Sequence, residues 1–191
     1  ELGHQFGAEH TFNGETEACG GGNRADTSAY EPGSASSIMG YAGICGEQNI
    51  QMNSDPYFHI HSIDQMKAFT QTGDGASCGT RVTKTNTAPV VDAGQDYTIP
   101  AKTPFELVGS ATDVDSDTLS YSWEQFDLGT ASASKQDDQT DDGKRPLFRM
   151  FEPTDSPSRV LPKLSDVLSG AATYGETLPT TDRELNFRLV V

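Results

Sequence analysis

The pattern of apolar and polar positions changes near residue 80. After that point, apolar and polar residues alternate along three short runs, Phe105–Gly109, Leu119–Glu124 and Leu185–Val191. A period of two turns one face of a strand toward a core and the other toward water, which is typical of antiparallel sheets. We therefore predict an all-β second part, arranged as an antiparallel sandwich.

The first part shows much less periodicity. The stretch Asn13–Ser37 is too rich in Gly, Asn and Ser for regular structure. Ile63, Met66 and Phe69 recur at helical spacing and predict a helix of roughly two to three turns, with Ser62 as its N-cap. The first part is therefore expected to be helical or irregular.

Two polar stretches indicate how the chain divides. Thr80–Pro89 reads as an extended linker, and the Asp-rich stretch Thr130–Gly143 as a mobile loop. We predict an α+β multidomain chain with a first part at 1–80, a linker at 81–88 and a β-sandwich at 89–191. The last strand of the sandwich is expected to be missing.

Composition and charge exclude some functions. The 191 residues include 13 Lys and Arg against 28 Asp and Glu, a net charge of −15. Such a charge repels phosphate backbones, so no nucleic-acid partner is expected. No apolar run approaches the ~20 residues of a membrane span. An acidic chain with few cysteines fits a secreted bacterial protein.

The first ten residues contain the pattern E-x-x-H-x-x-G-x-x-H, at Glu1, His4, Gly7 and His10. Gly7 permits a turn with positive φ that ends a short helix and brings His10 back toward His4. In this pattern the Glu lies beside the metal, where it takes a proton from a zinc-activated water. Three protein ligands would leave one position of a catalytic zinc open.

A methionine in a Ser/Gly-rich turn, Met39, follows this pattern. Together the two features resemble the metzincin zinc endopeptidases, in a bacterial form of the reprolysin/adamalysin-like branch. The resemblance implies that 1–80 is the C-terminal half of a catalytic domain, and that the third zinc-binding His lies upstream of residue 1. Glu1 is then the general base, His4 and His10 are zinc ligands, and Met39 forms the Met-turn.

Tyr41 follows the Met-turn by two residues. In the astacin and serralysin branches a tyrosine at this place contacts zinc or the oxyanion, so the resemblance implies a transition-state stabiliser. A wall residue of the site is the other interpretation, and both stay open. Thr11, directly after His10, differs from the Asp that is usual in reprolysins.

The three cysteines are Cys19, Cys45 and Cys78, an odd number. The resemblance implies a Cys19–Cys45 disulfide below the active site, and a partner for Cys78 upstream of residue 1. A Cys45–Cys78 disulfide with a free Cys19 is the alternative. His59 and His61 form an H-x-H pair, for which packing or capping is favoured over metal binding.

The second part resembles PKD-type immunoglobulin-like domains, with Trp123 as the core tryptophan. Asp113, Asp115 and Asp117 alternate in one loop, and such oxygen ligands suit Ca²⁺, with Asn86 as a further candidate. A turn capped by its own Asp side chains is the alternative.

These patterns predict a fragment of a secreted zinc metalloendopeptidase that acts on protein or peptide substrates. The expected cofactors are Zn²⁺ and, as a candidate, Ca²⁺. We expect the 191-residue chain itself to bind zinc weakly and to be inactive. A non-catalytic binding or adhesion module with a degenerate zincin part is the alternative. The sequence does not determine the oligomeric state.

Overall fold

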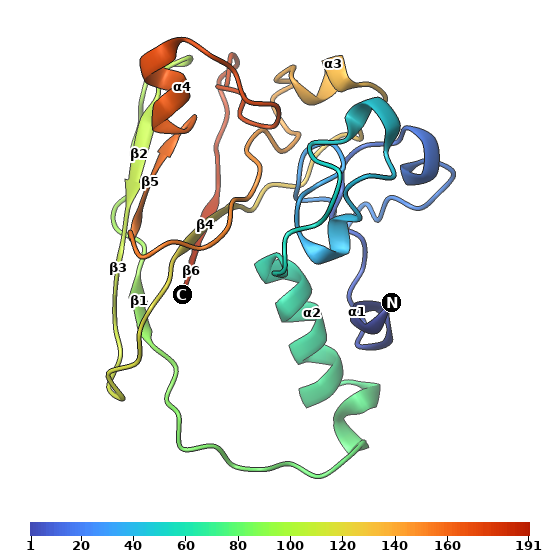
Figure 1. Cartoon of the computed structure of the whole chain (residues 1–191), viewed down its shortest axis with the longest axis vertical. Helices are drawn as coiled ribbons and strands as arrows, with labels where there is room; N and C mark the ends of the chain where they lie inside the picture. Colours follow the sequence, from blue (N-terminus) through green and yellow to red (C-terminus); the bar gives the residue numbers. More distant parts are fainter.

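The computed structural model describes residues 1–191 as a mixture of short helices and small sheets. The helices α1, α2 and α3 lie on one side and the strands β1, β2, β3 and β5 on the other (Figure 1). The helices are α1 (Leu2–Gln5), α2 (Ile60–Gln71), α3 (Lys135–Asp138) and α4 (Leu164–Ser169), with 3₁₀ turns η1 (Glu17–Cys19), η2 (Ile38–Gly40), η3 (Gly46–Gln48) and η4 (Asp74–Ser77). The strands are β1 (Val90–Asp92), β2 (Phe105–Val108), β3 (Ser110–Thr112), β4 (Ser122–Gln125), β5 (Ser158–Leu161) and β6 (Phe187–Val190).

Helix α2 is the one long helix of the first part. The predicted helix exists, but it begins three residues earlier than expected. His59 is the N-cap, and its ring Nδ1 accepts a hydrogen bond from the His61 backbone N–H. The predicted cap, Ser62, is buried inside the helix and its hydroxyl has no hydrogen-bond partner. A side chain already inside the first turn is badly placed to cap it.

The strands form three antiparallel pairs, β1 with β3, β2 with β5 and β4 with β6. Gly109 separates β2 from β3 and packs against Leu189 and Trp123 of the β4–β6 pair. The antiparallel arrangement agrees with the alternating pattern of the sequence. Three two-stranded pairs do not by themselves amount to an immunoglobulin-like sandwich.

Strand β4 departs from the predicted pattern of one buried and one wet face. All four of its residues are buried. The start of α2 covers the expected polar face, where the Ile60 backbone N–H donates to Glu124 Oε2 at 2.7 Å. His59 Nε2 lies 3.3 Å from the Gln125 carbonyl oxygen. The Glu124 side chain and the Gln125 carbonyl of β4 are therefore partners of the first part of the chain.

The stretch 130–143 is also not the mobile loop that its composition predicts. Ser132, Asp138 and Asp141 are buried, and the stretch includes α3, which lies above the first part in Figure 1. Gly14 and Ser132 form a parallel bridge, and Gln48 donates to the Ser132 carbonyl oxygen at 3.0 Å. Composition failed here because polar side chains of the first part satisfy the polar groups of this stretch.

Residues 80–89, which include the predicted linker, carry no helix or strand, and all of them are exposed except Pro89, directly before β1. In Figure 1 the chain runs through this region as an extended segment between η4 and β1. None of the helices is both long and apolar enough to cross a membrane.

Candidate metal centre

Helix α1 and the turn after it bring His4 and His10 together. The helix ends at Gln5, and Gly7 has φ +84°, the positive value expected of the turn. The Gly7 N–H donates to the His4 carbonyl oxygen at 2.9 Å and closes this turn. As a result, His4 Nε2 and His10 Nε2 lie 3.1 Å apart.

The second nitrogen of each ring faces a backbone carbonyl. His4 Nδ1 lies 2.7 Å from the Ala8 carbonyl oxygen, and His10 Nδ1 lies 2.6 Å from that of Asn23. A carbonyl only accepts hydrogen bonds, so each neutral ring carries its proton on Nδ1. In these tautomers both Nε2 atoms present lone pairs to each other. Two facing lone pairs at this distance repel unless a proton or a metal ion lies between them.

The geometry of the pair fits zinc. Two nitrogen ligands at about 2.0–2.1 Å from a tetrahedral ion are ~3.3 Å apart, close to the observed separation. Histidine ligands of metals also donate their other N–H to a carbonyl or carboxylate, as both rings do here. Within residues 1–191 no group of three or more His, Cys, Asp or Glu side chains gathers at one point. The chain therefore supplies two converging ligands.

Tyr41 and Glu1 lie beside the pair. The Tyr41 ring centroid is 5.0 Å from that of His10 and 6.0 Å from that of His4. Its hydroxyl accepts from the amino group of Glu1 at 3.1 Å. Burial and the nearby Glu1 carboxylate raise the pKa of Tyr41, so the phenol stays protonated and able to donate. The structure thus brings Tyr41 and the Glu1 backbone to the histidine pair.

Met39 lies beneath α1, in the 3₁₀ turn η2. Its side chain is buried, and its sulfur occupies the space that a Cβ on Gly3 would need. The Thr11 N–H donates to the Met39 carbonyl oxygen at 3.1 Å, next to His10 in sequence. This contact places Met39 as a floor below the histidine-bearing segment.

Glu31 supports the same region and was not found from the sequence. Its buried carboxylate accepts from the Thr11 hydroxyl at 2.6 Å and from the backbone N–H groups of Ser36 and Ser37 at 3.0 and 3.2 Å. It thereby joins the residue after His10 to the start of the Met39 turn. A lone Glu in a Gly/Ser-rich stretch gives no sequence signal of burial, because its partners come from two separate segments.

Cys19 and Cys45 form the disulfide that the resemblance implied. Both are buried with Phe12 and Ala35, in a small apolar core below the histidine pair. Cys78 is an exposed free thiol. The bond therefore closes a loop that contains Gly20–Gly22 and the Met39 turn.

Residues 1–68 match a metallopeptidase family model. Its description is Metallo-peptidase family M12B Reprolysin-like. No curated protein and no solved structure matches the chain. The matched residues include Glu1, His4, His10, Met39 and Tyr41, so the metallopeptidase-like segment is the one that carries the histidine pair.

The other candidate ligands lie apart from this segment. The Asp113 carboxylate accepts from the backbone N–H groups of Asp115 and Asp117, and Asp115 accepts from Thr87 N–H. These bonds form a turn held by its own side chains, and calcium binding there stays a prediction. His59 stacks on Tyr30 and the His61 ring packs against Tyr30 at a tilt, in agreement with the packing role favoured for them.

Proposed function

We propose that residues 1–68 form the zinc-binding part of a metalloendopeptidase site, with His4 and His10 as two of its ligands. One observation carries the proposal. The Nδ1 atom of each ring faces a backbone carbonyl oxygen, and the two Nε2 atoms converge at 3.1 Å. The metallopeptidase family match over the same residues supports the choice of metal and reaction. A further ligand must come from water or from outside residues 1–191.

The chain's own groups then have distinct tasks in peptide hydrolysis. Zinc, when bound, supplies Lewis-acid chemistry toward a peptide carbonyl and lowers the pKa of water. Glu1 is proposed to take the proton of the attacking water and to pass it to the leaving amine. Tyr41 donates its phenol hydrogen to the oxygen that gains negative charge. The substrates are proteins or peptides.

The proposal also covers the location of the protein and the nature of the second part of the chain. A disulfide such as Cys19–Cys45 is stable in oxidising compartments, which supports a secreted protein. The antiparallel strand pairs and the burial of Trp123 between them support a PKD-type immunoglobulin-like origin for the second part. We regard that part as non-catalytic.

Zinc titration of the metal-free chain tests the proposal. Wild type should bind one Zn²⁺ in competition with a chromophoric chelator, and with modest affinity because two protein ligands hold it. His4→Ala and His10→Ala should each weaken binding by at least tenfold. His61→Ala, which removes a histidine that contacts Ser28 instead, should leave the affinity unchanged.

The controls separate this site from adventitious binding. If His4→Ala and His10→Ala bind zinc as tightly as wild type, the proposal is wrong. The alternative of a binding module with a degenerate zincin part would then be favoured. Circular dichroism of each variant must match wild type, so that a loss of affinity reports the ligands and not the fold.

A further inference from the structure

The orientation of His10 depends on a carbonyl in a loop with few packing contacts. Asn23, whose carbonyl oxygen accepts from His10 Nδ1, is exposed and follows Gly20-Gly21-Gly22. A Cβ placed on Gly21 or Gly22 would meet nothing within 4 Å. Asn23 is held within its own segment, where its Nδ2 donates to the Ala18 carbonyl oxygen at 2.8 Å and its N–H donates to that of Gly20 at 3.3 Å. An anchor from a distant segment restricts such a Gly-rich loop further. His4 differs, because its carbonyl partner belongs to Ala8 in its own turn.

Arg24 supplies that anchor. Its side chain is only 6% exposed, and its one ion pair is with Asp26, which is 89% exposed. The guanidinium Nε and Nη2 donate to Asn13 Oδ1 at 3.1 and 2.9 Å, and Nη2 also donates to the Gly129 carbonyl oxygen at 2.9 Å. A planar guanidinium bound at several points limits the positions that the backbone of its own residue can take. The Asn23 carbonyl belongs to the peptide group that precedes Arg24, so its position is limited as well.

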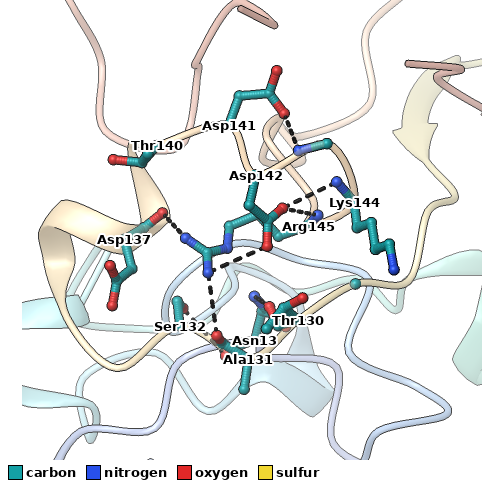
Figure 2. Close-up of polar contacts among 12 residues, drawn as sticks. Asn13, Thr130, Ala131, Ser132, Asp137, Thr140, Asp141, Asp142, Lys144 and Arg145 are labelled. Atoms are coloured by element: carbon teal, nitrogen blue, oxygen red, sulfur yellow. Dashed lines mark hydrogen bonds and ion pairs between the residues drawn. The ribbon is translucent and has the colours of Figure 1, made fainter. Parts of the chain in front are cut away.

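Gly129 belongs to the second part of the chain, and its neighbourhood is rigid. The Thr130 carbonyl oxygen accepts from Asn13 Nδ2 at 3.0 Å. Figure 2 shows the Arg145 guanidinium closing the loop above these residues, where it donates to the carbonyl oxygens of Asp137 at 2.6 Å and Ala131 at 3.4 Å. Gly129 also packs so closely on the Arg145 backbone that a Cβ would overlap it.

We propose that Arg24 is a positioning residue through which the second part of the chain orients His10 for metal binding. The path runs from Gly129 and Asn13 to the Arg24 guanidinium, and from there to the Asn23 carbonyl and His10 Nδ1. This inference rests on the proposed zinc site. It assigns the second part a task beyond spacing: that part completes the hydrogen-bonded support of one ligand.

The test compares Arg24→Gln with wild type in two measurements on the whole chain. In the metal-free protein, long-range ¹H–¹⁵N NMR spectra should show His4 and His10 as Nδ1–H tautomers. In Arg24→Gln, His10 should become a mixture of tautomers while His4 keeps its own, which makes His4 an internal control. Zinc affinity should fall about 10–100-fold, the usual effect of losing an outer-shell partner of a metal ligand.

Arg159→Gln is the matched control. Arg159 is another arginine with a largely covered side chain, 12% exposed, and it donates to the carbonyl oxygens of Trp123 and Arg149 and to Glu176. Its loss should lower stability but leave the His10 tautomer and the zinc affinity as in wild type. Asn13→Ser, which keeps Arg24 and removes its acceptor, should repeat the Arg24→Gln result if that variant folds poorly.

The outcomes separate the two proposals. An unchanged His10 tautomer and unchanged zinc affinity in both Arg24→Gln and Asn13→Ser would overturn the positioning role, while the zinc site itself would stand. Zinc binding that is insensitive to His4→Ala would instead overturn the proposed function. Equal shifts of both histidines would show general loosening of the fold and would also contradict the inference.

Discussion

Gly3 carries no side chain, and the sulfur of Met39 fills the space that one would need. Met39 is buried, so it has little room to move. Gly3→Ala should therefore lower the free energy of unfolding by about 1–2 kcal/mol, because an overpacking cost of ~1–3 kcal/mol exceeds the gain in helix propensity of up to ~1 kcal/mol. Urea denaturation followed by circular dichroism measures the change.

Gln5→Ala provides the control, since Gln5 is exposed on the same helix. Its effect should stay within about 0.5 kcal/mol. If Gly3→Ala is as stable as wild type, Met39 does not form a close floor under α1.

At the scale of elements, α2 and β4 meet through two buried titratable side chains. Burial lowers the pKa of His59 to about 4 and raises the pKa of Glu124 to about 8. Their contact, with Nε2 and Oε2 3.6 Å apart, therefore joins two neutral groups and not an ion pair. A neutral pair avoids the cost of burying charge at the junction between the two parts.

This pair predicts how stability depends on pH. The ordinary pKa values are 6.5 for His59 and 4.5 for Glu124, so between pH 4.5 and 6.5 the folded and unfolded chains each hold one proton on the pair. From pH 6.5 to 8 the folded chain keeps the Glu124 proton and the unfolded chain has none, so stability falls as pH rises. Between pH 4.5 and about 4 the unfolded chain holds two protons and the folded chain one, so stability falls as pH decreases; below about pH 4 both hold two and this dependence ends.

Glu124→Gln should remove the alkaline part of this dependence. Relative to wild type, the variant should gain up to about 2 kcal/mol between pH 6.5 and 8, because one pKa unit corresponds to ~1.36 kcal/mol. Denaturant melts at several pH values measure the difference. Asp64→Asn, which breaks an exposed pair with Arg188, is the control and should give a nearly parallel profile. A parallel profile for Glu124→Gln would mean that Glu124 is ionised in the folded chain.

At the scale of the whole molecule, one buried network joins the two parts. Gln48 Oε1 accepts from the backbone N–H groups of Glu15 and Thr16 at 2.8 and 2.9 Å. Its Nε2 donates to Asp138 Oδ2 at 2.9 Å, and Asp138 is also bound by the Tyr174 hydroxyl. The first part therefore shares its polar core with residues 132–138 and 174.

This network predicts that the two parts unfold together. Gln48→Ala should lower the unfolding free energy by about 2–4 kcal/mol, because it leaves several buried donors and acceptors unpaired. The loss should appear in the fluorescence of Trp123, the one tryptophan, which lies in the second part. Lys67→Ala, an exposed change in the first part, should leave that transition in place. A Trp123 transition that Gln48→Ala does not move would show independent unfolding.

Local spacing made part of this arrangement predictable. Gly7 ends α1 with positive φ, and His10 returns to His4, because a turn of a few residues fixes both positions. The alternating runs likewise predicted antiparallel strands. The cap of α2 was misplaced, because the docking of His59 on β4 is a long-range contact. The supporting residues Glu31 and Arg24 were not identified from the sequence. For Arg24 a signal existed, because it is the sole Lys or Arg before Lys67 and a single basic residue in an acidic segment is a candidate for a specific role.

The sequence by itself determined the histidine pair, the Met39 turn and the strand-forming runs, since each depends on residues a few positions apart. Only the tertiary structure decided that the Asp-rich stretch 130–143 is packed, that β4 is buried on both faces, and that Arg24 links Gly129 to the His10 segment. The physical reason is that the identity of a polar residue does not show whether its side chain lies in water or in a core. Its burial is decided by hydrogen-bond partners up to about a hundred residues away, as for Arg24 and Gly129.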